Sequence, residues 1–122
     1  MPKLLIVDDE VDVREFAAKF FRKRKVEVIT APGGEEAVDS AGKNKPDLVL
    51  LDIGMSGIDG IETLRRIKAQ DANARVIMVT GRSPGDGDSF DKCSQLGALN
   101  YIHKPLELDE LERIVLKELL CK

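Results

Sequence analysis

The chain of 122 residues has no tryptophan and only one tyrosine and four phenylalanines, so its core must be mainly aliphatic. It has two cysteines, Cys93 and Cys121, which match no metal-binding or redox spacing. Isolated cysteines of this kind fit a reduced, cytoplasmic protein and exclude a disulfide-stapled fold. No apolar run approaches the roughly 18 residues of a membrane span, and no signal sequence is recognisable, so we expect no membrane association.

Positive and negative charges are nearly equal in number. The chain has 22 acidic and 19 basic residues and a net charge of −3. This mild acidity argues against direct nucleic-acid binding, which needs a basic surface. The one basic cluster, Lys19 with residues 22–25, is interpreted as a solvated helix end, where cations complement the helix dipole. The length suits a single globular domain over residues 1–122, large enough to bury a core without staples.

Apolar and polar residues alternate in blocks that predict strands and helices in turn. Short apolar runs, typical of strands buried on both faces, cover residues 4–7, 26–30, 48–52, 75–80 and 99–103. Helical patterns cover residues 11–24, 35–42, 59–67, 89–96 and 107–121. This alternation predicts an α/β fold, a doubly wound parallel sheet of five strands with helices on both faces. Right-handed crossovers favour the flavodoxin-like strand order 2-1-3-4-5.

For three of the predicted helices, the sequence also predicts which residues face the core or end the helix. In the helix over residues 11–24, a stripe at helical spacing is expected to face the core: Val13, Phe16, Ala17 and Phe20. In the next helix, Gly42 is expected to be the C-terminal stop. In the last helix, four residues are expected to point inward: Leu108, Leu111, Val115 and Leu119. Leu116 and Leu120 lie off that stripe and fit either the core or a partner or dimer surface.

Polar residues stand where four of the predicted strands end: Asp8 and Asp9, Asp52, Thr80, and Lys104. In a 2-1-3-4-5 sheet the ends of strands one, three, four and five are neighbours, so these residues should gather at one edge. Three carboxylates at close range repel one another, and Mg²⁺, which prefers oxygen ligands and keeps several waters, relieves that repulsion. The backbone carbonyl of Gly54 could add a ligand.

Asp52 taken alone is ambiguous, because a single aspartate after a strand is commonly a helix cap. Together with the neighbouring acids, the Thr80 hydroxyl and the Lys104 ammonium, it belongs to a site suited to a metal and a phosphoryl group. A carboxylate in such a site can act as the nucleophile and form an acyl phosphate.

The residues Asp8-Asp9, Asp52, Thr80 and Lys104-Pro105, in this order, closely resemble the response-regulator receiver domain of two-component signalling, the CheY-like family. Three further motifs support the resemblance: Ala31-x-x-Gly34-x-Glu36-Ala37, Met55-x-x-x-Asp59-Gly60 and Gly97-Ala98-x-x-Tyr101. The resemblance covers the whole chain. It implies a phosphorylation-activated signalling switch rather than a metabolic enzyme, one that catalyses only its own phosphorylation and dephosphorylation.

The resemblance also implies a role for each site residue. Asp52 accepts a phosphoryl group from a sensor histidine kinase, a phosphotransfer protein or a small phosphodonor. Mg²⁺ is bound directly by Asp9, Asp52 and the Gly54 carbonyl, and by Asp8 through water. Lys104 pairs with the phosphoryl oxygens, and Thr80 moves to hydrogen-bond them.

The resemblance places the output on the face formed by residues 89–96, 99–103 and 107–121. Tyr101 turns inward on phosphorylation, and this face then changes its binding to a downstream protein partner or to a second copy in a homodimer. Without that role, Tyr101 is an edge tyrosine that fills a gap. His103, the only histidine, is interpreted as an exposed strand-end residue.

Two other functions remain open for this set of residues, and the chain departs from the family pattern at several positions. An aspartyl-phosphate phosphatase of the haloacid-dehalogenase type carries a second acid two residues after its nucleophile, where this chain has Gly54. A receiver-like scaffold that signals without phosphate does not need the complete set of acids, hydroxyl and lysine. Ser56 replaces the usual proline, and the interval from Thr80 to Lys104 is lengthened within residues 83–88. Gly54 and Arg82 hold the two positions that, by the resemblance to the family, tune phosphoryl lifetime.

Overall fold

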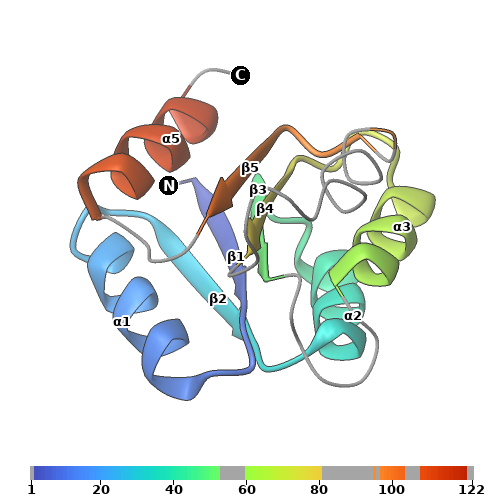
Figure 1. The fold of residues 1–122 in the computed structure, drawn as a ribbon, viewed down its shortest axis with the longest axis horizontal. Coiled ribbons are helices and arrows are strands. Elements are labelled where there is room, and N and C mark those ends of the chain that lie inside the picture. Colours follow the sequence, from blue (N-terminus) through green and yellow to red (C-terminus); the bar gives the residue numbers. More distant parts are fainter. Residues whose placement is uncertain (1, 53–59, 81–94, 96, 104–107, 121–122) are drawn as a thin grey trace.

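The short apolar runs form strands and the periodic segments between them form helices (Figure 1). The structure, a computed structural model, describes residues 2–52, 60–80, 95, 97–103 and 108–120. The strands are β1 (Lys3–Val7), β2 (Glu27–Ala31), β3 (Leu48–Asp52), β4 (Val76–Thr80) and β5 (Asn100–His103). The helices are α1 (Val11–Arg22), α2 (Gly34–Asn44), α3 (Gly60–Gln70) and α5 (Leu108–Leu120). The helix expected over residues 89–96 falls outside the described residues.

The five strands form one sheet in which every neighbouring pair is parallel. The strand order is β2-β1-β3-β4-β5, as the alternation of elements predicted. β1 is therefore interior to the sheet, and its Leu4 pairs with Val28 on one side and Leu48 on the other. None of the helices described in this structure has the length and apolar character that crossing a bilayer requires.

Each face of the sheet is covered by its own pair of helices (Figure 1). Alternate residues of β1 divide between the two sides, because successive side chains of a strand point to opposite faces. Leu4 and Ile6 join the core under α1 and α5, whereas Leu5 and Val7 join the core under α2 and α3. The prediction of helices on both faces is thus confirmed.

The prediction for the inward face of α1 is partly wrong. Ala17 is buried as expected, but the other buried residues are Ala18 and Phe21. Phe16, expected inside, has 59% of its surface exposed, and Phe20 is partly buried at the edge of the core. The buried face of α1 thus consists of two small alanines and Phe21. The helix is therefore rotated about its axis relative to the orientation that the apolar periodicity predicted.

Gly42 does not end α2, contrary to the prediction. The helix continues to Asn44, and Lys45 forms its cap in the left-handed conformation, with φ of 47°. A Cβ atom at residue 42 would lie 3.0 Å from Oε1 of Gln70 on α3. The glycine therefore permits the close approach of α2 to α3.

The packing of α5 agrees with the prediction where it is described. Leu111, Val115 and Leu119 are buried, and Leu116 packs at the edge of the same core. The side chains of Leu108 and Leu120 fall outside the described residues. Two ion pairs also hold this helix: Arg75 with Glu118, and Arg24 with Glu112 at 3.0 Å.

Part of the basic cluster has a structural role beyond solvation. The guanidinium carbon of Arg24 lies 3.6 Å from the centroid of the Phe20 ring, while its Nε reaches Glu112 on α5. Nη2 of Arg22 donates a hydrogen bond to the carbonyl of Val28 at 3.2 Å. Two arginines of the cluster therefore tie the end of α1 to α5 and to β2.

On the outer side of α3, Glu62 accepts hydrogen bonds from Arg65 and from Nε of Arg66, the latter at 2.7 Å. The bonds from Arg65, then Arg66, lower the pKa of Glu62 from 4.5 to about 2. A carboxylate with a depressed pKa stabilises the folded state above its unfolded pKa, and this contribution is lost as the pH falls through the folded pKa.

We expect Glu62→Gln to destabilise the protein slightly at neutral pH, because the exposed pair is weak. The difference from wild type should shrink as the pH falls from 4.5 toward about 2, the interval over which the two states differ in protonation. Urea unfolding over a pH series measures it. A difference that stays constant across that interval would contradict the assignment.

Candidate functional site

The register of the sheet brings two acidic residues to the same edge. Val7 at the end of β1 pairs with Leu51 of β3, so Asp8 and Asp52 follow as the next neighbours across these strands. Parallel strands lie about 4.8 Å apart. Asp52 in turn pairs with Val79 of β4. The carboxyl ends of β1 and β3 thus place two aspartates on neighbouring strands, where both line one small cleft at the sheet edge that binds ligands in open α/β folds.

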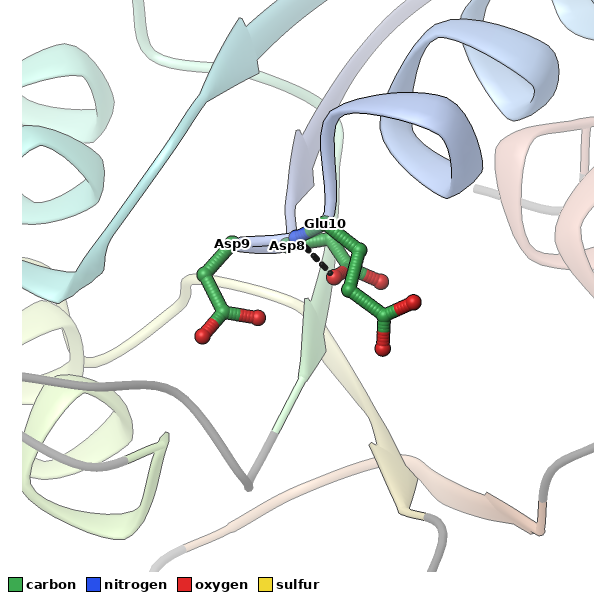
Figure 2. Close-up of side chains that lie close together, drawn as sticks. All are labelled: Asp8, Asp9 and Glu10. Carbon is green, nitrogen blue, oxygen red and sulfur yellow. Dashed lines mark hydrogen bonds between the residues drawn. The ribbon is translucent and has the colours of Figure 1, made fainter.

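A third and a fourth acid lie in the turn between β1 and α1 (Figure 2). Asp8, Asp9 and Glu10 each offer a carboxylate oxygen, and these oxygens lie within 4.8 Å of one another. The turn is fixed by hydrogen bonds from the Asp8 amide to the Ala31 carbonyl, at 3.3 Å, and from the Glu10 amide to Oδ1 of Asp8, at 2.9 Å. Glu10 was not predicted as a site residue, although its place directly after Asp9 was a signal.

The burial of these acids differs. Asp8 and Asp52 are each only 5% exposed, whereas Asp9 and Glu10 are exposed. Removing two carboxylates from water at adjacent strand ends is unfavourable unless positive charge or hydrogen bonds compensate. The Glu10 amide gives Asp8 part of that compensation. Carboxylate oxygens gathered at one edge are the ligands that Mg²⁺ prefers, so the donor set fits Mg²⁺.

Among the described residues, the cleft at this edge is small. It has a volume of about 10 Å³ and is lined in part by Asp8, Asp52 and Val79. That volume holds roughly one water-sized occupant. A larger cavity of about 290 Å³ lies between the C-terminal ends of α2 and α3, where Lys45 and Asp71 are its charged lining residues. The acidic edge, rather than the larger cavity, has the chemistry of a metal and phosphoryl site.

The structure brings two of the predicted site residues, Asp8 and Asp9, together in the acidic turn. Asp52 lies at the end of the neighbouring strand and lines the same small cleft as Asp8, but it is not one of the carboxylates that lie within 4.8 Å of one another. The backbones of Thr80 and Tyr101 lie on β4 and β5, paired with His103 and Met78 respectively, while their side chains fall outside the described parts. Gly54 and Lys104 are also outside, as are Ser56, Arg82, the lengthened segment 83–88, Cys93 and Cys121. The roles of these residues stay predictions.

Known proteins are similar to this chain over most of its length. The family model described as the response regulator receiver domain matches residues 4–116. Sporulation initiation phosphotransferase F of Bacillus subtilis (strain 168) is 41% identical over 120 residues, which are 98% of this chain and 95% of that protein. The alkaline phosphatase synthesis transcriptional regulatory protein PhoP of the same organism is 34% identical over 111 residues. These cover 89% of this chain but only 45% of PhoP, so the chain spans about half of that relative.

Solved structures agree with the sequence relatives. The CheX–CheY–BeF3–Mg²⁺ complex from Borrelia burgdorferi matches with a TM-score of 0.89 at 35% identity, covering 99% of this chain and 90% of that chain. TrrA from Thermotoga maritima, in complex with Mg²⁺ and BeF, matches with a TM-score of 0.83 at 35% identity, covering 98% and 100%. The chain therefore belongs to the response regulator receiver domains, the phosphorylation-dependent signalling switches of two-component systems.

Proposed function

We propose that Asp52 is the phosphoryl acceptor of this receiver and that Asp8, Asp9, Asp52 and the backbone carbonyl of Gly54 bind Mg²⁺. The observation that carries the proposal is the pair of nearly buried carboxylates, Asp8 and Asp52, on adjacent strand ends. The phosphoryl group comes from a sensor histidine kinase or a phosphotransfer protein, in the cytoplasm. The receiver domain extends over residues 1–122.

Asp8 and Asp52 have different places in the fold, and these places support different roles. Oδ1 of Asp8 accepts a hydrogen bond from the Glu10 amide, and the backbone of Asp8 is hydrogen-bonded to Ala31 and Arg14. Asp52 is the last residue of β3, all of whose residues are buried, so a rigid strand aims its carboxylate at the sheet edge. These contacts support Asp8 as an acid held in place for metal binding and Asp52 as the attacking group.

In the transfer, a carboxylate oxygen of Asp52 forms a bond to phosphorus while the bond from phosphorus to the donor breaks. When bound, Mg²⁺ supplies positive charge that offsets the repulsion between the carboxylate and the anionic phosphoryl group. Lys104 neutralises further charge, and Thr80 donates a hydrogen bond to the phosphoryl oxygens. Hydrolysis of the acyl phosphate resets the switch, and this is the only reaction that the protein catalyses besides its own phosphorylation.

The output face consists of residues 89–96 together with β5 and α5. Phosphorylation adds a charge of about −1.5 to −2. Thr80 donates a hydrogen bond to the phosphoryl group, and Lys104 pairs with its charge. Inverting a population from 1:99 to 99:1 needs about 5.5 kcal/mol of differential stabilisation. Two charge-assisted hydrogen bonds at roughly 1.5–3 kcal/mol each are of that order. Tyr101 on β5 then turns inward, and the face changes its affinity for a downstream protein or for a second copy of the chain.

The test is phosphorylation with acetyl phosphate and Mg²⁺, followed by intact mass measurement. The wild type should gain one phosphoryl mass, and Asp52→Asn should gain none, because an amide is a poor nucleophile. Asp39→Asn, the same substitution at an exposed position on α2, is the matched control and should react as the wild type does. A phosphoryl gain by Asp52→Asn equal to that of the wild type would show that the acceptor is another residue.

A further inference from the structure

Arg14 lies near the start of α1 and contacts the backbone of the acidic turn, residues 8–10, that precedes this helix. Its Nη1 donates a hydrogen bond to the backbone carbonyl of Asp8, at 2.7 Å. Its own amide donates to the carbonyl of Glu10, at 3.0 Å. One half-buried residue therefore contacts the backbone at both ends of the segment that carries the three acids.

The contact with Asp8 restrains the peptide unit that joins Asp8 to Asp9. The carbonyl of Asp8 and the amide of Asp9 belong to one planar peptide unit, so fixing the carbonyl oxygen fixes the plane from which Asp9 continues. The other described bonds of the turn act on the Asp8 amide and on the Asp8 side chain. The guanidinium thus adds a restraint on the peptide between the two acids.

We propose that Arg14 is a positioning residue for the metal site and raises its affinity for Mg²⁺ by holding the peptide between Asp8 and Asp9. The inference rests on the proposed function, in which Asp9 is a ligand. Partners that orient metal ligands typically change metal affinity by about 10- to 100-fold when removed. Because this bond acts through the backbone, we expect an effect at the lower end of that range.

The charge of Arg14 works in the opposite direction. A guanidinium beside the acids repels a divalent cation, so removing it should by itself tighten Mg²⁺ binding. The group is half-exposed and donates to a neutral carbonyl, so solvent screens its field. We therefore expect the loss of positioning to exceed the gain from removing the charge. The two effects have opposite signs, which makes the sign of the change in affinity decisive.

The experiment is a Mg²⁺ titration of the wild type, Arg14→Met and Arg22→Met. Binding is measured by calorimetry and by the chemical shifts of the backbone amides in NMR spectra. Arg22 is a matched control, since it lies on the same helix and also donates to a backbone carbonyl, that of Val28. Both substitutions remove one positive charge. Arg14→Met should bind Mg²⁺ about tenfold more weakly, and Arg22→Met should bind as the wild type does. Binding by Arg14→Met that equals or exceeds that of the wild type would overturn the proposal.

Phosphorylation by acetyl phosphate gives an independent readout. With Arg14→Met, the Mg²⁺ concentration for half-maximal rate should rise about tenfold, while the rate at saturating Mg²⁺ stays near the wild-type value. A lower rate at every Mg²⁺ concentration would instead indicate general damage to the fold and contradict a positioning role. If Arg14→Met fails to fold, Arg14→Lys, which keeps the charge and most of the stem, should show a smaller shift in the same direction.

The outcomes also separate this inference from the proposed function. If the wild type binds Mg²⁺ and is phosphorylated on Asp52 but Arg14→Met titrates like the wild type, only the role of Arg14 is wrong. If the wild type binds no Mg²⁺, the proposed metal site and the role of Arg14 fail together.

Discussion

Replacing Phe21 with alanine should lower the free energy of unfolding by about 3–5 kcal/mol. Phe21 has no exposed surface and lies in the core that α1 and α5 share with the sheet. Its ring also meets that of Phe20 edge to face, with centroids 5.1 Å apart. Truncation removes this contact and leaves a cavity that closely packed neighbours cannot fill. Since domains are stable by only about 5–15 kcal/mol, the loss is a large fraction of the total.

Phe16→Ala is the matched control, because it makes the same substitution on the same helix at a residue that is 59% exposed. It should change the free energy of unfolding by no more than about 0.5 kcal/mol. Urea unfolding followed by far-UV circular dichroism is the suitable measurement, since the chain has no tryptophan. Equal losses for the two variants would mean that α1 is rotated toward the stripe that periodicity predicted.

The second large effect is expected at the acidic edge. In metal-free buffer, Asp8→Asn should raise the free energy of unfolding by about 1–3 kcal/mol, because unit charges about 5 Å apart repel by roughly 3 kcal/mol at an effective dielectric near 20. The substitution removes one charge beside Asp52 and the exposed acids. The amide oxygen of asparagine can still accept the hydrogen bond from the Glu10 amide, so the turn is kept.

Mg²⁺ should reduce or reverse this advantage. A ligand that binds only the folded state adds about 2.7 kcal/mol of stability at a concentration 100 times its Kd. The wild type should gain that amount, and Asp8→Asn should gain less because it has lost an acid of the site. Urea unfolding with a chelator and with Mg²⁺ measures both changes, with Asp39→Asn as the control. A variant less stable than the wild type under metal-free conditions would show that repulsion at this edge is already relieved by other contacts.

Much of the fold followed from elementary patterns. The bounds of β3 agree with the prediction because an uninterrupted apolar run is closed by a carboxylate and preceded by a proline-containing turn. The strand order followed from counting alternating elements and applying the handedness of crossovers. The neighbouring positions of Asp8 and Asp52 then required only that the ends of adjacent parallel strands meet at one edge.

The predictions that were wrong concern residues whose place is set by contacts between helices or between a helix and the sheet. Phe16, Phe20 and Phe21 offer more than one apolar stripe, and periodicity alone cannot choose between them. The packing of Ala17 and Ala18 against the sheet makes that choice. Gly42 was interpreted from local helix rules, although its neighbour is Gln70 on another helix.

Arg14 was missed for a related reason. Its partner is a backbone carbonyl, which every residue has, so residue types give no signal for the contact. Only the direction in which α1 leaves the turn brings the guanidinium to Asp8. Contacts from a side chain to the backbone are therefore the part of this site that pattern analysis could not supply.

The interior position of β1 has a consequence for how the chain folds. Its alternate residues belong to two separate cores, and its two neighbours, β2 and β3, are separated from it in the sequence by one and two helices. Pairing across such long separations is slow, and neither core is complete without this strand. Folding should therefore be a single cooperative event. The turn that carries Asp8 and Asp9 then takes its shape only when the whole sheet does, so a partly folded chain would offer no phosphorylation site to a kinase.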